Sequence, residues 1–254
     1  MSKTPSEEMI KINKSDDHIS KIHDYHLDIQ NNNIYLFPWK ELAGYTEFPG
    51  TEPGVEFTMS SKFILNARLC MQANPNSPLV IHMKTCGGDW NEGMAIFDML
   101  INYPCDTTIL NYTHARSMSS IIFQAATKRV MMPHSYFMFH DGTYSDSGTL
   151  KTVLSGLAFY DKTGSVMLNL YTERMKQKGK FSSWSRERIK DFLVDEMNKK
   201  EDVYLTAKEA VEWGLADSIF DGNWGGLTNY TDTQSQNALN FADRMDLNAR
   251  KNFL

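Results

Sequence analysis

Cysteine is scarce in this sequence, and the few cysteines are widely spaced. Only three of the 254 residues are cysteines, Cys70, Cys86 and Cys105, and no two of them form a Cys-x-x-Cys pair. A chain of this length does not need disulfides to stabilise its core, so we expect reduced thiols and a cytoplasmic protein. The spacing also argues against a structural zinc site, and we predict neither a metal nor a cofactor.

Long hydrophobic runs and an excess of basic residues are also missing. The apolar runs are too short to span a bilayer, and the first twenty residues contain no apolar stretch typical of a secretory signal. The net charge is −5, and the Lys and Arg residues are scattered rather than clustered. A nucleic-acid surface would need a basic stripe. We therefore predict that the protein binds neither membranes nor nucleic acid.

What the sequence does contain is an alternation of short apolar runs with amphipathic segments. In the amphipathic segments, apolar residues recur every three or four positions. This order is typical of an α/β fold with parallel strands and crossover helices. The predicted strands cover residues 33–37, 79–83, 107–112, 129–132 and 135–140. The predicted helices cover residues 57–73, 91–103, 149–178, about 185–194 and 207–213.

Both ends of the chain and one internal stretch are polar and interrupt this pattern. Residues 1–30 are charged, and we expect a flexible N-terminal arm or pro-segment. The Pro- and Gly-rich stretch 38–54 predicts a loop. Residues 222–254 are polar and rich in Asn, and we expect them to be a peripheral C-terminal extension. Residues 31–221 then form the folded domain.

Three chemically distinctive features each follow a predicted strand. A Gly-Gly turn at Gly87 and Gly88 follows the strand at 79–83, Ser117 follows the strand at 107–112, and His140 closes the strand at 135–140. Active sites of open α/β sheets lie at the carboxyl ends of the strands, so we expect the three turns to meet in one crevice.

Ser117 taken alone has two interpretations. A serine at the start of a helix is more often an N-cap than a nucleophile. A helix N-terminus, however, also offers unpaired N–H groups and a partial positive charge. With His140 as a general base and glycine amides as oxyanion donors, the same turns could carry out acyl transfer. An acid near the C-terminal helix would then have to orient the histidine.

Four segments carry a more specific pattern. In chain order they are TCGGDW, THARSMSS, YFMFHDG and KEDVYLTAKEAVEWGLADSI. Together they resemble the proteolytic subunit of the Clp protease, a serine peptidase of the Clp/crotonase fold. That family carries a Gly-Gly turn, then Gly-x-Ala-x-Ser-Met-Gly, then Met-x-His-Gln-Pro, and last an acid ahead of Glu-Ala-x-x-Tyr-Gly-Leu-x-Asp. The resemblance covers about residues 33–220.

The resemblance implies a role for each candidate residue. It implies Ser117 as the nucleophile, His140 as the base and Asp202 as the carboxylate that orients the histidine. Such a triad is recognised by geometry and not by the order of its members along the chain. The resemblance also implies an oxyanion hole formed by the Gly87–Gly88 turn and the Met118 N–H, with Gly88 the favoured glycine.

The resemblance further implies an architecture and partners. The fold would be a repeated β-β-α spiral with a protruding handle helix at about 149–178. Through this helix, rings of identical subunits would stack into a barrel, and we expect its stripe of Met and Tyr residues to pack against another subunit. The substrate would be a peptide or an unfolded protein, and a Clp-type ATPase would be a possible partner.

Some residues allow other assignments. Asp141 lies next to His140 and competes with Asp202, but neighbours in a strand point to opposite faces, which favours Asp202. Cys86 could be a thiol nucleophile, but no base is evident for it. We attribute a group of acids and histidines in the N-terminal arm to chance rather than to a metal site: His23, Asp24, His26 and Asp28.

Three other functions compete with a Clp-type serine endopeptidase. The chain could be a dedicated processing protease, for instance for a viral capsid or scaffold protein, without an unfoldase. It could be an acyl-CoA enzyme of the crotonase type, although no pair of acids suited to hydration is evident. It could also be a non-catalytic assembly subunit, against which the complete triad argues.

Overall fold

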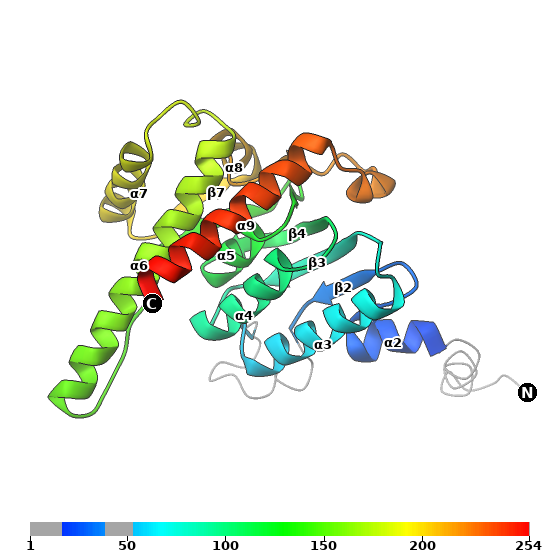
Figure 1. Ribbon diagram of the computed structural model, residues 1–254, viewed down its shortest axis with the longest axis horizontal. Helices are drawn as coiled ribbons and strands as arrows, with labels where there is room; N and C mark the ends of the chain where they lie inside the picture. Colours follow the sequence, from blue (N-terminus) through cyan, green and yellow to red (C-terminus); the bar gives the residue numbers. More distant parts are fainter. Residues whose placement is uncertain (1–16, 39–52, 254) are drawn as a thin grey trace, which may run out of the picture.

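A computed structural model describes residues 17–38 and 53–253 (Figure 1). Residues 1–16 of the expected N-terminal arm lie outside the described residues. So do residues 39–52, which make up most of the expected loop at 38–54. Within the described part, no helix is both long and apolar enough to cross a membrane.

The centre of the molecule is an eight-stranded, mostly parallel sheet. Six strands follow the order β1-β2-β3-β4-β5-β8. A second branch starts at the carboxyl end of β4, which pairs in parallel with β6, and β6 pairs antiparallel with β7. The strands are β1 (Leu27–Asp28), β2 (Asn33–Leu36), β3 (Leu79–Thr85), β4 (Thr107–Arg116), β5 (Lys128–Met131), β6 (Tyr136–Phe139), β7 (Val203–Thr206) and β8 (Ser218–Ile219). The predicted α/β class is therefore confirmed.

Helices cover one face of this sheet, and a short turn covers part of the other. Helices α3, α4 and α5 lie side by side over one face (Figure 1). The 3₁₀ helix η1 contacts β3 and β4, and a small apolar cluster with Leu227 forms there. The helices are α2 (Asp17–Tyr25), α3 (Phe57–Ala73), α4 (Trp90–Ile101), α5 (Met118–Gln124), α6 (Leu150–Gln177), α7 (Arg186–Lys200), α8 (Ala207–Trp213), η1 (Trp224–Thr228) and α9 (Asp232–Phe253).

Strand β3 is buried on both faces, which explains its nearly continuous apolar sequence. Its one histidine, His82, has its Nδ1 2.9 Å from the Tyr112 hydroxyl and stacks on the ring of Tyr35. Burial lowers the pKa of His82 to about 4, although Asp28 acts in the opposite direction. His82 is therefore neutral at pH 7 and belongs to the packing of the sheet.

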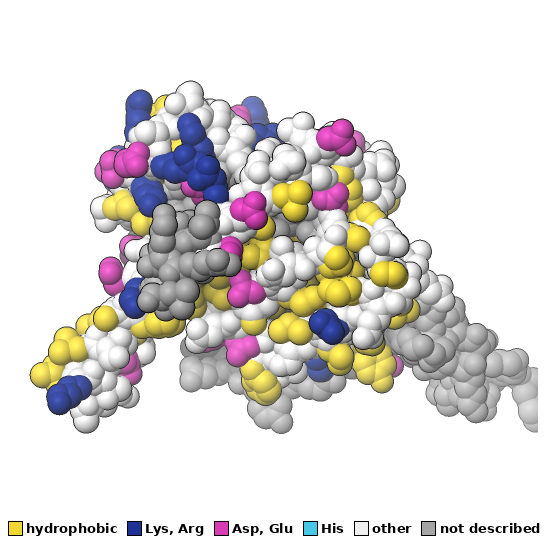
Figure 2. Space-filling model, viewed as in Figure 1, with side chains coloured by type: hydrophobic (Ala, Val, Ile, Leu, Met, Phe, Trp, Pro, Cys, Tyr) yellow, Lys and Arg dark blue, Asp and Glu magenta, His cyan; other side chains and the backbone are white. Residues whose placement is uncertain are grey.

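Helix α6 has two halves in different environments. Its C-terminal half is buried, and Tyr171 is only 1% exposed. Its N-terminal half projects from the body, and Leu150 is 74% exposed (Figures 1 and 2). We expected the Met and Tyr stripe of this helix to pack against another subunit. For Met167, Tyr171 and Met175 this was wrong, because all three are buried within their own chain.

The C-terminal helix α9 is not peripheral, contrary to expectation. Phe241 is fully buried, lies 6.2 Å from the ring of Phe97, and has the Arg174 guanidinium 3.6 Å from its ring centroid. Met245 is also part of the main core. Phe241 and Met245 lie four positions apart on one helix face, and this narrow stripe is easily missed in a polar tail.

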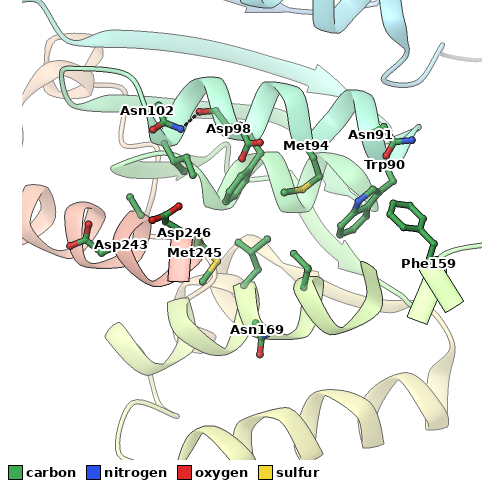
Figure 3. Close-up of a pocket in the computed structure, with 15 residues that line it drawn as sticks. Trp90, Asn91, Met94, Asp98, Asn102, Phe159, Asn169, Asp243, Met245 and Asp246 are labelled. Atoms are coloured by element: carbon green, nitrogen blue, oxygen red, sulfur yellow. Dashed lines mark hydrogen bonds between the residues drawn. The ribbon is translucent and has the colours of Figure 1, made fainter. Parts of the chain in front are cut away.

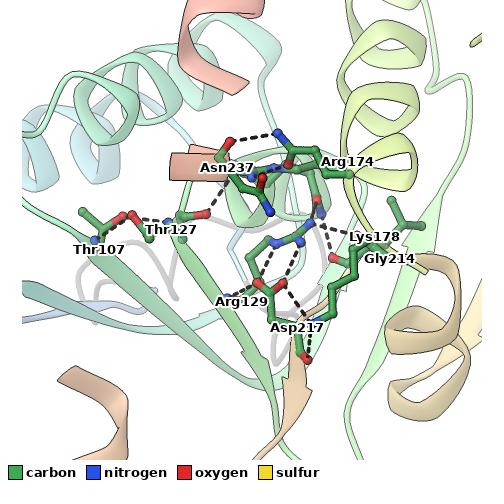
Figure 4. A network of polar contacts seen from close by, with 12 residues as sticks. Thr107, Thr127, Arg129, Arg174, Lys178, Gly214, Asp217 and Asn237 are labelled. Atoms are coloured by element: carbon green, nitrogen blue, oxygen red, sulfur yellow. Dashed lines mark hydrogen bonds and ion pairs between the residues drawn. The ribbon is translucent and has the colours of Figure 1, made fainter. Parts of the chain in front are cut away.

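A polar network joins α6 to the loops around β5 (Figure 4). Arg129 forms two hydrogen bonds of 3.0 Å to the carboxylate of Asp217, and Lys178 lies 3.6 Å from the same group. Burial alone would raise the pKa of Asp217, but Arg129 holds it below its usual value. The buried Arg174 donates to the carbonyls of Gln124 and Ala126. These contacts tie the inner half of α6 to the sheet.

The N-terminal end of the described chain is attached to the sheet. Strand β1 pairs antiparallel with β2, and both Leu27 and Asp28 are buried. Part of the segment that we assigned to a flexible arm thus belongs to the folded body. Four further elements were not predicted: the helices α2 and η1 and the strands β7 and β8. Helix α7 extends to Lys200 instead of about 194.

Candidate active site

Ser117 occupies a sharp turn between β4 and α5. Its backbone has φ 53° and ψ −127°, a conformation that residues with a side chain rarely adopt. The Ser117 N–H donates to the Met138 carbonyl at 3.1 Å, and the Ser117 carbonyl accepts from the Ser120 N–H at 2.9 Å. The side chain forms no capping hydrogen bond. Ser117 therefore occupies the N-cap position, but its hydroxyl does not cap the helix.

The Ser117 hydroxyl contacts the imidazole of His140. Ser117 Oγ lies 2.9 Å from His140 Nε2, and His140 Nδ1 lies 3.1 Å from Asp202 Oδ1. The histidine side chain is 21% exposed and the carboxylate 42%. The structure thus brings the three predicted side chains into one chain of contacts that opens to solvent.

The register of β6 and β7 accounts for the meeting of His140 and Asp202. These strands run antiparallel, with Phe139 opposite Val203. The residue after Phe139 and the residue before Val203 therefore face each other across the pair. We had not predicted β7, whose four residues VYLT (203–206) are alternately buried and exposed, as in a strand with one face on the core.

Asp141, the rival acid, has a different environment. Its backbone carbonyl accepts a hydrogen bond from the Tyr160 hydroxyl at 2.5 Å. Among the described ion pairs, His140 pairs with Asp202. The second oxygen of Asp202 lies 3.4 Å from the Tyr204 hydroxyl, a long contact at an exposed position.

The Gly-Gly turn passes directly beside the Ser117 turn. A Cβ added to Gly87 would lie 2.8 Å from the Ser117 Cβ, and Gly87 itself has φ +99°. Only glycine fits there, both for space and for backbone conformation. Gly88 forms a parallel bridge with Val55: Val55 N–H donates to the Gly87 carbonyl, and Asp89 N–H donates to the Val55 carbonyl.

This bridge determines which way the Gly88 amide points. The bonded groups of the neighbouring residues 87 and 89 face Val55, so the Gly88 N–H is directed to the opposite side. Gly88 lines the same cavity as Ser117 and Met118, whereas Gly87 does not. The Met118 N–H is the first of helix α5 and has no acceptor within its own helix. Two amides near Ser117 are thus available to a ligand.

The cavity at this site has a volume of about 540 Å³. Its inner wall combines apolar residues of α5 and α6, including Met118, Ile121 and Met167. Tyr171 also lines the cavity, and its hydroxyl is 2.6 Å from the Ser120 hydroxyl. Our prediction placed only the three turns here. It did not include α6, because the contact of a helix with a distant turn leaves no local mark in the sequence.

The described part of the chain contains no obvious set of metal ligands. Across residues 17–38 and 53–253, no group of three or more His, Cys, Asp or Glu side chains is arranged to hold a metal ion. Cys86 precedes the Gly-Gly turn, and its carbonyl accepts from the Arg116 Nε at 3.3 Å.

Comparison with known proteins identifies the family of the chain. The sequence model of the Clp protease family matches residues 52–223. The chain belongs to the Clp protease family. Its fold is therefore the Clp/crotonase-like fold, and the chain is a serine-type endopeptidase. The match covers all four segments from which the resemblance was drawn, so that prediction is confirmed.

Individual relatives are distant, and each aligns with more than half of this chain. One is the ATP-dependent Clp protease proteolytic subunit 2 of Corynebacterium diphtheriae, 26% identical over 72% of this chain and 85% of the relative. The subunit of the same name from Mycolicibacterium paratuberculosis is 28% identical over 60% of this chain and 74% of the relative. The ATP-dependent Clp protease proteolytic subunit of Mesostigma viride is 26% identical over 56% of this chain and 57% of the relative. These findings do not favour the acyl-CoA alternative.

Proposed function

We propose that Ser117, His140 and Asp202 form the catalytic triad of this Clp-family endopeptidase. The observation that carries the proposal is the continuous contact of 2.9 Å from Ser117 Oγ to His140 Nε2 and of 3.1 Å from His140 Nδ1 to Asp202 Oδ1. His140 Nε2 takes the hydroxyl proton while Ser117 Oγ attacks the peptide carbonyl. Asp202 accepts a hydrogen bond from the His140 Nδ1–H and stabilises the imidazolium.

The backbone amides of Gly88 and Met118 form the oxyanion hole. They donate to the oxygen of the tetrahedral intermediate, where negative charge develops, and preorganised donors are most effective there. The strained turn at Ser117 brings Oγ close to both amides. His140 then returns the proton to the leaving amine, and the acyl group remains on Ser117. A water molecule, deprotonated by His140, hydrolyses this ester and restores the serine.

The substrate is a peptide or an unfolded polypeptide. The apolar wall of Met118, Ile121 and Met167 suits an apolar side chain next to the scissile bond. The names of the relatives include "ATP-dependent", which supports a Clp-type ATPase as partner and does not favour a dedicated processing protease. None of the three cysteines forms a disulfide, which supports a cytoplasmic location.

We further propose that residues 31–221 form the peptidase domain and that the subunits assemble into stacked homo-oligomeric rings through α6. The outer half of that helix carries a set of exposed large apolar side chains (Figure 2). A monomer would leave these in water. They are Leu150, Leu154 and Leu157.

The decisive experiment is active-site labelling with a fluorophosphonate probe. The wild-type protein should be labelled and should cleave an unstructured peptide, and Ser117→Ala should lose both properties. Ser183→Ala, an exposed serine without a described hydrogen bond, is the matched control and should be labelled normally. Equal labelling of Ser117→Ala and wild type would refute the assignment.

A further inference from the structure

A second cavity adjoins the active-site cavity and is larger than it. It has a volume of about 620 Å³ and lies between α4, α6 and α9. The two cavities share Trp90, Asn91 and Phe159. Figure 3 shows Trp90 and Phe159 facing each other at one end, and Asp243 and Asp246 on α9 at the other. We call this cavity the distal groove.

The lining of the distal groove changes in character along its length. Its floor is apolar, formed by Met94, Phe97, Ile101, Val166, Leu170 and Met245. The end away from Ser117 is acidic, with Asp98, Asp243 and Asp246. Among the described residues that line the groove, there is no Lys, Arg or His. The groove therefore combines an apolar floor with an acidic end.

Asp98 has no cation partner within the described part of the chain, and neither has Asp243. Asn102 contacts the backbone carbonyl of Asp98 at 2.9 Å and not its carboxylate. Partial desolvation raises the pKa of the Asp98 carboxyl above its usual value, and no cation of the described residues compensates its charge, although the residue remains open to solvent. A cation from another molecule would supply that compensation.

The length of α4 gives the distance between the acidic end of the distal groove and the end that the groove shares with the active-site cavity. Eight residues separate Trp90 from Asp98, and at about 1.5 Å per residue this is roughly 12 Å. An extended peptide covers that distance in about four residues. A chain with its scissile bond at Ser117 thus reaches Asp98 about four to six residues further along.

We propose that the distal groove is an extension of the substrate cleft. In it, Asp98 and Asp243 select a lysine or arginine about four to six residues from the scissile bond. This inference rests on the proposed function, because the cleft begins at the Ser117 cavity. A polypeptide fits better than other occupants, since the groove is continuous with the active site and its charge complements a basic side chain. The apolar floor accepts the residues in between.

The test compares peptide substrates that differ at one position. A neutral reference peptide is prepared with Lys, Gln or Glu at each position from four to six residues on either side of the scissile bond, and kcat/KM is measured. Since exposed ion pairs are weak, we expect Lys to be preferred over Gln by about fivefold at one of these positions. High salt should reduce the preference.

Three variants identify the groove as the source of the preference. Asp98→Asn keeps the shape of the side chain and should bring the Lys-to-Gln ratio close to one. Asp98→Lys should invert the preference toward Glu. Asp243→Asn, on the exposed side of α9, should lower the ratio and serves as a second variant if Asp98 substitutions disturb folding. The matched control is Asp191→Asn, an exposed acid on α7, which should leave the ratio unchanged.

The outcomes separate this inference from the proposed function. If the neutral peptide is cleaved but Lys, Gln and Glu are equivalent at every position, the inference is overturned and the proposed function stands. A Lys preference that persists in both Asp98→Asn and Asp243→Asn also overturns it. If neither cleavage nor probe labelling depends on Ser117, the proposed function fails, and the inference fails with it.

Discussion

Ser117 combines an unfavourable backbone with a favourable position. A positive φ costs a residue with a side chain about 1–2 kcal/mol, and the turn is kept in place by hydrogen bonds of the Ser117 N–H and carbonyl. Where the family carries glycine after the Ser-Met pair, this chain has Ser119. The Ser119 hydroxyl is a buried polar group that a glycine would lack. It donates to the Thr85 carbonyl at 2.7 Å, so it does not remain without a hydrogen bond.

The two candidate acids provide a test at the scale of single residues. We predict that Asp202→Asn lowers kcat by about 10²- to 10⁴-fold, because the neutral amide no longer stabilises the imidazolium and favours the wrong tautomer of His140. Asp141→Asn should have a much smaller effect. Steady-state kinetics on an unstructured peptide would measure both. Similar losses in the two variants would contradict the assignment of Asp202.

Helix α6 serves two environments with one periodic pattern. Its inner turns contact α5 through Tyr171 and the turn before β5 through Arg174, while its outer turns expose leucines. Apolar periodicity alone cannot distinguish these cases, because a stripe that faces the same core and a stripe that faces another molecule look the same in sequence. Helix α9 is the opposite case, because a few buried apolar residues are enough to hold a mostly polar helix on the core.

The role of α9 can be tested with two substitutions two residues apart. Phe241→Ala should lower the free energy of unfolding by about 3–5 kcal/mol, because it leaves a cavity beside Phe97 and Arg174. Leu239→Ala is the control: Leu239 is 61% exposed, and its loss should change stability little. Urea denaturation measures both. An equally small effect of both would mean that α9 is not part of the cooperative core.

At the scale of the whole molecule, the projecting half of α6 is the feature that a single chain does not explain. Exposed leucines over several turns of a protruding helix cost solubility unless another surface covers them. Stacking of subunits through this helix would bury them and would bring several active-site cavities into one enclosed space. The proposal of an assembled protease therefore has a physical reason within this chain.

We predict that Leu154→Asp weakens this assembly. The introduced charge would have to be desolvated at the subunit contact, so the distribution of masses should shift toward smaller species. The control is Ser155→Asp, which places the same charge on the face that carries Lys151 and Lys162. Native mass spectrometry of the full chain measures the distribution. Identical distributions for wild type and Leu154→Asp would argue against stacking through this face.

Much of the site could be predicted because its parts are marked locally. The Gly-Gly turn, Ser117 before a helix and His140 at the end of a strand each have a recognisable neighbourhood of a few residues. The helices at 57–73 and 207–213 coincide with α3 and α8 for the same reason. Elements whose identity depends on a partner were missed: β7 is a strand because β6 lies beside it.

The sequence by itself thus determined the α/β class, the order of the main elements and the four segments that belong to the Clp protease family. Periodicity, turn residues and short motifs are properties of neighbouring residues, and they survive without knowledge of the fold. Only the tertiary structure decided that His140 contacts Asp202 and not Asp141, that Gly88 and not Gly87 lines the cavity, and that α9 enters the core. These outcomes depend on strand register and on helix packing between residues far apart along the chain, where no local pattern specifies the partner.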